Sequence, residues 1–197
     1  FELIEGASWD QVGPTGLQIV DHLTHNVRRG QMAVWADYYE RIFNFREIRY
    51  FDIEGKKTGL FSKAMTSPDG KIRIPLNESQ DDKSQIEEFI REYHGEGIQH
   101  IALECSDIYT TIPQMRERGI DFQDTPETYY ELIDTRLPDH KEDVAFLRDQ
   151  RILIDGGEAQ GGGFLLQIFM EPCIGPIFFE IIQRKGNEGF GEVNFQA

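Results

Sequence analysis

The alternation of apolar and polar residues divides the first half of the chain into one strand, one helix and three further strands. "LQIVDHLTHNV" (17–27) has strand composition, and "AVWADYYERIF" (33–43) places Trp35, Tyr38 and Ile42 at the spacing of one helical face. The strand-like segments that follow are separated by the turn-forming "EGKK" and "SPDG", and they are "REIRYFDI" (46–53), "GLFSKAMTS" (59–67) and "KIRIPLNE" (71–78). The predicted order of elements is βαβββ.

A short helix joins this unit to the rest of the chain. Ser84 and Glu87 form a capping box at the start of "QIEEFIREYH" (85–94), which ends before the glycines of "GEG". Residues 1–16 contain turn residues and no clean period, so we expect an entering linker there. The first module is therefore expected to span residues 17–95, connector helix included.

The same order repeats over residues 96–197, which we expect to form a second module. It contains a strand (97–105), a helix that begins near Thr110 with Pro113 in its first turn, and strands at 121–124, 151–157, 163–170 and 177–184. The charged, turn-rich segment 125–150 is predicted to be a surface excursion with at least one helical turn. Two βαβββ modules predict an α+β fold, a curved, half-open mixed β-barrel with its helices outside and a concave face inside.

Composition narrows the choice of partners. The 197 residues contain 35 acidic and 20 basic side chains, a formal net charge of -15, which disfavours nucleic acid and anionic membranes as partners. No apolar run is long enough to span a membrane. Cys105 and Cys173 belong to no CxxC pattern, which argues against a zinc ribbon or an iron–sulfur site and predicts two buried thiols in a reducing compartment.

The candidate chemistry begins with Glu180, which lies inside the apolar run "GPIFFEII". Burial costs a carboxylate on the order of several kcal/mol of hydration free energy, unless a cation or hydrogen-bond donors replace the water. The first strand of each module carries a histidine between apolar residues, His22 and His100. If both modules curve around one cavity, these two imidazoles and Glu180 form the ligand set of a non-haem Fe(II) facial triad.

His25 competes with His22 for the role of ligand. Strand alternation places the two side chains on opposite faces, so both cannot bind the same ion from a regular strand. Spacing does not choose between them.

Several blocks of the sequence resemble the catalytic C-terminal half of the bacterial 4-hydroxyphenylpyruvate dioxygenase family, from about Leu17 to Phe195. They are "VDHLTHNV", "SKAMTSPDGKIRIPLNE", "GEGIQHIAL", "LLQIF", "GPIFFEIIQRKG" and "GFGEVNF". The resemblance implies the vicinal oxygen chelate fold with Fe(II) bound by His22, His100 and Glu180, and a structural role for His25. It also implies that 4-hydroxyphenylpyruvate and O2 are converted to homogentisate and CO2 by oxidative decarboxylation, ring hydroxylation and side-chain migration.

The resemblance further assigns residues to the pocket. It implies that one set of amide and hydroxyl groups orients the reactants, namely Ser62, Asn77, Gln85, Gln99 and Gln167. It implies that a second set binds the substrate, namely Phe169, Phe178, Phe190, Asn194 and Phe195. It implies a cytoplasmic homo-oligomer, either a dimer or a tetramer. We also expect that the family's amino-terminal half and its carboxy-terminal gating helix lie outside this sequence.

Three other functions share the expected fold. 4-Hydroxymandelate synthase uses the same substrate and metal but hydroxylates the benzylic carbon. A vicinal oxygen chelate module can also be a non-catalytic binding protein, which the His22, His100 and Glu180 set disfavours. Zinc or nickel isomerases of this superfold generally use an additional protein ligand.

Overall fold

The eight strands of the computed structural model form one mixed sheet in the order β2-β3-β4-β1-β5-β8-β7-β6. The structure describes residues 13–54, 59–158, 161–191 and 194. The strands are β1 (Leu17–Val27), β2 (Arg46–Glu54), β3 (Gly59–Thr66), β4 (Arg73–Ser79), β5 (Gly97–Cys105), β6 (Leu153–Gly156), β7 (Phe164–Phe169) and β8 (Phe178–Lys185). The helices are α1 (Met32–Phe43), α2 (Gln85–Tyr93), α3 (Ile108–Glu117), α4 (Glu127–Glu131), α5 (Ile133–Arg136) and α6 (Val144–Gln150).

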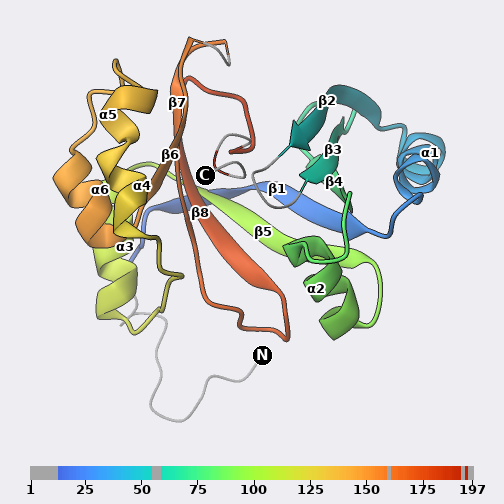
Figure 1. Ribbon diagram of the computed structural model, residues 1–197, viewed down its shortest axis with the longest axis horizontal. Coiled ribbons are helices and arrows are strands. Elements are labelled where there is room, and N and C mark those ends of the chain that lie inside the picture. The colour runs from blue at the N-terminus through green and yellow to red at the C-terminus, as the bar shows by residue number, and fades with distance from the viewer. Residues whose placement is uncertain (1–12, 55–58, 159–160, 192–193, 195–197) are drawn as a thin grey trace.

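Both halves of the sheet follow the same pairing rule. In the first half β1 pairs in parallel with β4, and β4, β3 and β2 follow in antiparallel pairs. In the second half β5 pairs in parallel with β8, and β8, β7 and β6 follow in antiparallel pairs. The antiparallel pair β1–β5 joins the halves at the centre of the molecule (Figure 1). The predicted fold of two βαβββ units in one curved mixed sheet is confirmed.

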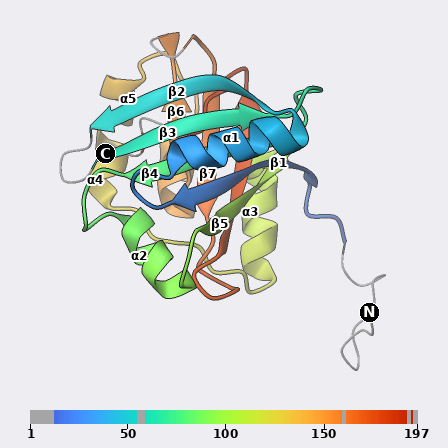
Figure 2. The same cartoon turned by 90° about the vertical axis from the view of Figure 1, so that its right-hand side faces the viewer.

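The helices cover the outside of this sheet, where the apolar side chains gather. Helix α1 lies across the strands of the first half (Figure 2), and α3 to α6 gather beside the second half (Figure 1). Two large cores result, the first containing Val27, Met32, Ala36, Tyr39, Phe45, Met65, Ile74 and Leu76 and the second centred on Ile108, Ile112, Tyr130, Ile133, Leu147, Ile154, Leu166, Ile168 and Ile181. A third, smaller cluster consists of Ile86, Phe89 and Ile90 of α2. Each buried side chain of this size contributes roughly 1.5–3 kcal/mol, so the stability lies outside and the inner face is free to carry polar groups.

The buried face of α1 differs from the predicted one. Met32, Ala36 and Tyr39 are buried, whereas Tyr38 is 44% and Ile42 63% exposed. Both sets have helical spacing, because α1 carries apolar residues on two sides, and the period alone does not say which side meets the sheet.

Three further predictions about local structure were wrong in detail. Helix α3 begins at Ile108 and not near Thr110, because the Asp107 carboxylate accepts the Tyr109 N–H at 3.1 Å and caps the helix three residues before Thr110. Pro113 consequently lies inside the helix. The expected strand at 121–124 contributes only an isolated bridge from Phe122 to Met170. Cys105 is buried as expected, but Cys173 is exposed.

Other local predictions are confirmed. The Ser84 hydroxyl accepts the Glu87 N–H at 3.3 Å and caps α2. The excursion 125–150 holds the three short helices α4, α5 and α6. In the part of the chain that the structure describes, no helix is long and apolar enough to cross a membrane.

His25 supplies a test of the outer core by pH. The side chain is buried between the sheet and α1, 4.4 Å from the Trp35 ring, and its Nδ1 lies 3.0 Å from the Tyr39 hydroxyl. Burial lowers the pKa of His25 to about 4, against an opposing effect of the Glu96 charge. The unfolded chain therefore binds more protons than the fold between about pH 6.5 and pH 4, and stability falls as the pH falls through this window.

We predict that the free energy of unfolding decreases by up to about 1.4 kcal/mol per pH unit on this account between about pH 6.5 and pH 4. Urea denaturation at several pH values should show this slope in the wild type and lose it in His25→Gln. The control is His94→Asn at an exposed, left-handed helix end. Equal slopes for the wild type and His25→Gln would contradict the prediction.

Candidate metal centre

Two irregularities in the β1–β5 ladder aim side chains at the inner face of the sheet. Val20 pairs with Leu103 and His22 with Ala102, so Asp21 is an extra residue on β1. Thr24 pairs with His100 and His25 with Ile98, so Gln99 is an extra residue on β5. Such bulges rotate a side chain away from strict alternation. Each one therefore places the residue before a histidine on that histidine's side.

The register of four strands brings the candidate ligands together. Ala102 pairs with His22 on one side and with Glu180 on the other, and Glu180 pairs with Phe169 of β7. His100 lies two residues from Ala102 and therefore shares its face. Because the residue between them is an alanine, no large β5 side chain separates His22 from Glu180.

The three side chains converge at atomic distances. Glu180 Oε2 lies 3.3 Å from His22 Nε2 and 3.4 Å from His100 Nε2, and one ligand atom from each residue lies within 4.8 Å of the others. All three residues are buried, Glu180 to 2% exposure. Strand alternation does separate His25, whose side chain packs on α1. The structure thus brings His22, and not His25, to Glu180 and His100.

Hydrogen bonds on the far side of each ring set the orientation of the imidazoles. His22 Nδ1 lies 2.7 Å from Asp21 Oδ1, and His100 Nδ1 lies 3.2 Å from Gln99 Oε1. With a cation bound, the Nδ1 protons would lie in these bonds, which would leave both Nε2 atoms beside Glu180 free to act as ligands. The extra residues of the two bulges are therefore the orienting partners of the two histidines.

Burial and hydrogen bonding shift the pKa values of Glu180, His22 and His100 in opposite directions. Burial raises the pKa of Glu180, but hydrogen bonds from His100 and His22 outweigh it and lower the pKa to about 2. Burial lowers the pKa of His22, yet its bonds to Asp21 and Glu180 raise it overall, whereas burial prevails at His100 and lowers its pKa. Glu180 is thus an anion at neutral pH despite its burial.

This donor set fits a divalent metal ion. Glu180 Oε1 is buried and has no hydrogen-bond partner among the described residues, so the carboxylate retains acceptor capacity toward a cation. Two neutral imidazoles with one carboxylate can bind one face of an octahedral ion and leave three positions open. A cation here would also offset the hydration that Glu180 loses.

A cavity of about 980 Å³ reaches His100 and Glu180, whereas His22 is not among the residues that line it. Its lining includes His100 and Glu180, together with the expected residues Asn77, Gln85, Gln99, Gln167, Phe169, Phe178, Phe190 and Asn194. Ser62 is buried and does not reach the lining, but it pairs with Asn77 across β3 and β4. Phe195 lies outside the described residues.

The aromatic residues pack directly on the histidines. The Phe178 ring stacks on His100 at 5.1 Å, and Phe169 meets Phe178 edge to face at 5.9 Å. Phe190 meets His22 edge to face at 5.2 Å. As alternation predicts, Phe178 shares the inner face with Glu180, whereas Ile181 belongs to the outer core. These rings exclude water from the inner end of the cavity.

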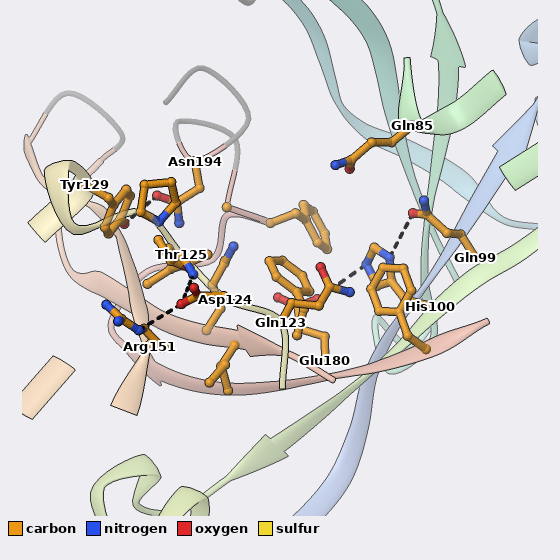
Figure 3. A pocket seen from close by; sticks show the side chains of 18 of the residues that line it. Gln85, Gln99, His100, Gln123, Asp124, Thr125, Tyr129, Arg151, Glu180 and Asn194 are labelled. Carbon is orange, nitrogen blue, oxygen red and sulfur yellow. Dashed lines mark hydrogen bonds and ion pairs between the residues drawn. The ribbon is translucent and has the colours of Figure 1, made fainter. Parts of the chain in front are cut away.

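The other end of the cavity was missed by sequence reasoning. Figure 3 shows Thr125, Asp124, Tyr129 and Arg151 there, with Glu180 and His100 at the opposite end. These residues come from the excursion 125–150 and from its flanks. The excursion was predicted to lie on the surface because it is charged and rich in turn residues. Tyr129 forms a hub whose hydroxyl lies 2.8 Å from Asn194 Oδ1 and accepts the Ile154 N–H. No periodicity in the sequence signals this contact.

Two curated relatives align with nearly all of the chain. Hemolysin VllY of Vibrio vulnificus is 70% identical over 182 residues, which are 92% of this chain and 51% of the relative. 4-Hydroxyphenylpyruvate dioxygenase of Pseudomonas aeruginosa is 66% identical over 197 residues, which are 100% of this chain and 55% of the relative. The expected resemblance to 4-hydroxyphenylpyruvate dioxygenases is confirmed, and the chain spans about half the length of the curated relatives it matches.

The fold and a family model lead to the same group of proteins. The structure of a triple mutant of 4-hydroxymandelate synthase from Streptomyces coelicolor superposes with a TM-score of 0.79 and 31% identity, covering 91% of this chain and 51% of that one. The model of the Glyoxalase/Bleomycin resistance protein/Dioxygenase superfamily matches residues 19–132, a range that contains His22 and His100. The chain belongs to the Glyoxalase/Bleomycin resistance protein/Dioxygenase superfamily.

Proposed function

We propose that the protein is an Fe(II)-dependent dioxygenase that converts 4-hydroxyphenylpyruvate and O2 to homogentisate and CO2. The observation that carries the proposal is the buried convergence of His22, His100 and Glu180 beneath a cavity lined by phenylalanine and amide side chains. The 66% identity to a curated 4-hydroxyphenylpyruvate dioxygenase over the whole chain supports it.

His22, His100 and Glu180 would hold the Fe(II) ion. Fe(II) held there would supply the Lewis-acid and redox chemistry that oxidative decarboxylation of a 2-oxo acid by dioxygen requires. The anionic end of the substrate needs no arginine clamp in this arrangement, which agrees with a cavity end lined by His100, Glu180 and aromatic rings.

The remaining groups of the pocket would orient the substrate and exclude water. Phe169, Phe178 and Phe190 form walls that fit an aromatic ring and keep water from the reacting atoms. Asn77 Oδ1, Gln167 Oε1 and Asn194 Nδ2 are buried without a partner among the described residues, so each can bind a phenol or oxo-acid group. Gln85 and Gln99 would add donors and acceptors, and Ser62 would act through Asn77.

4-Hydroxymandelate synthase is the second candidate, because a structure with that name superposes at a TM-score of 0.79. The two activities share substrate, metal and fold, and differ in product. Chromatography of the reaction mixture separates homogentisate from hydroxymandelate. A non-catalytic binding module is a third candidate, and it would show no iron-dependent oxygen uptake.

The proposal includes a cytoplasmic homo-oligomer, either a dimer or a tetramer. It rests on the family resemblance and not on the described residues. Sedimentation analysis of the purified protein distinguishes these states from a monomer.

We predict that Glu180→Gln lowers Fe(II) affinity by at least about tenfold and abolishes turnover, because the amide keeps the shape of the side chain and loses its charge. His100→Ala should have the same effect by removing a ligand. Anaerobic iron analysis per chain and oxygen uptake with 4-hydroxyphenylpyruvate measure both. The control is Glu171→Gln on the exposed surface, which should behave as wild type. Full iron content and oxygen uptake in Glu180→Gln would overturn the assignment.

Gly191 offers a test of the role of Gln167. Gly191 has a φ of 80°, and a Cβ there would overlap the Gln167 amide, coming within 2.7 Å of Nε2. Gly70 has a similar φ of 71° and open space around it. Alanine costs on the order of 1–2 kcal/mol of backbone strain at either position, but only at Gly191 must Gln167 move.

We therefore predict that Gly191→Ala raises KM for 4-hydroxyphenylpyruvate severalfold, whereas Gly70→Ala lowers the melting temperature without changing KM. Steady-state kinetics and thermal denaturation of both variants separate displacement of Gln167 from backbone strain. An equal change of KM in both variants would refute a substrate-orienting role for Gln167.

A further inference from the structure

We propose that Arg184 is a positioning residue that couples the orientation of His22 to the loop that carries Phe190. The inference deepens the proposed function, because it assumes that His22 is a metal ligand. It is carried by a closed ring of contacts that runs through Asp21, Arg184 and the 187–190 segment and returns to His22.

The first part of the ring is the bulge in β1. Asp21 is the extra residue of this bulge and is 6% exposed, although it carries a charge. Its Oδ1 accepts from His22 Nδ1 at 2.7 Å, which fixes the rotation of the imidazole. A buried carboxylate in this position needs a second charged partner to remain ionised in place.

Arg184 is that partner, and it binds Asp21 through both edges of the carboxylate. Arg184 Nε donates to Asp21 Oδ2 at 2.8 Å, and an Nη2 proton goes to Oδ1 at 2.7 Å. The planar fork of a guanidinium matches a carboxylate in this two-point geometry, whereas an ammonium does not. Arg184 lies four residues after Glu180 in β8, so strand alternation gives both the same face.

The opposite edge of the same guanidinium holds the loop after β8. Arg184 Nη1 donates to the carbonyl oxygens of Asn187 at 2.9 Å and Gly189 at 2.7 Å. The loop is tightened further because the Asn187 side chain accepts the Gly189 N–H at 2.7 Å. Four N–H groups of Arg184 are thereby used, two toward Asp21 and two toward the loop.

Phe190 closes the ring of contacts. Its ring lies 5.8 Å from the guanidinium carbon of Arg184 and 5.2 Å from the imidazole of His22. Phe190 also lines the cavity. One rigid cation therefore determines both the orientation of a ligand and the position of a cavity wall, although it reaches neither the metal position nor the cavity.

A nearby arginine supplies the matched control. Arg73 Nη1 lies 3.7 Å from Asp21 Oδ2 and 3.2 Å from Glu188 Oε2. Among the described residues it pairs with the Asp21 and Glu188 carboxylates, but it donates no hydrogen bond to the loop carbonyls and forms no two-point fork with Asp21. Replacing Arg73 by lysine should thus change the charge environment little and leave the coupling intact.

The test compares Arg184→Lys with Arg73→Lys in the protein. Anaerobic titration with Co(II) measures metal affinity by its visible spectrum, and hydrogen exchange measures protection of the 187–190 backbone. We expect Arg184→Lys to weaken Co(II) binding about 10- to 100-fold and to accelerate exchange of this segment, with Arg73→Lys within about twofold of wild type on both counts. Arg184→Lys should also raise KM for 4-hydroxyphenylpyruvate, because Phe190 loses its anchor.

Asp21→Asn provides a second variant should Arg184→Lys fail to fold. It changes no group of the loop and removes only the anionic partner that anchors the Arg184 guanidinium. Coupling requires that Asp21→Asn weaken Co(II) binding and also accelerate exchange at residues 187–190. Weaker metal binding with unchanged exchange, or no greater effect of Arg184→Lys than of Arg73→Lys, would overturn the proposal. Failure of the wild type to bind Co(II) would instead overturn the metal centre itself, and the coupling with it.

Discussion

Glu180 Oε2 lies within 3.4 Å of a nitrogen atom from both His22 and His100, in a buried part of the sheet. An ion in that position is costly by itself, and its hydrogen bonds to two imidazoles are what keep it ionised. Those imidazoles in turn need partners on their far sides, Asp21 and Gln99. The polar groups of the inner face therefore depend on one another: the buried Glu180 charge needs the two imidazoles, and the imidazoles need Asp21 and Gln99.

This constraint explains why the apolar cores lie where they do. A sheet whose inner face carries charged and amide side chains gains little hydrophobic stabilisation from that face. The stabilising burial is instead on the outside, between β1 to β4 and α1 and between β5 to β8 and α3 to α6. The helices support the strands from behind, and the strands hold the polar groups in register at the front.

The sequence predicted most of what depends on local pattern. The bounds of β1 and β5 agree with the predicted strands, since alternating apolar residues between turns are a strong signal. The convergence of His22, His100 and Glu180 needed the repeat of βαβββ units and the family resemblance, because no local spacing joins these residues. The side of α1 that is buried, and the contact of Tyr129 with Asn194, depend on tertiary packing that no periodicity encodes.

The bulges at Asp21 and Gln99 constrain the number of residues in β1 and β5. In an even ladder, the residue before each histidine would point away from it, toward the helices. Each extra residue shifts the alternation of inward and outward side chains by one position for the rest of the strand. Deleting Asp21 or Gln99 would restore an even ladder and remove only the orienting partner of the histidine, whereas a one-residue deletion elsewhere in β1 or β5 would turn a strand segment over. The number of residues on each side of the two bulges is therefore constrained, in addition to the identity of their side chains.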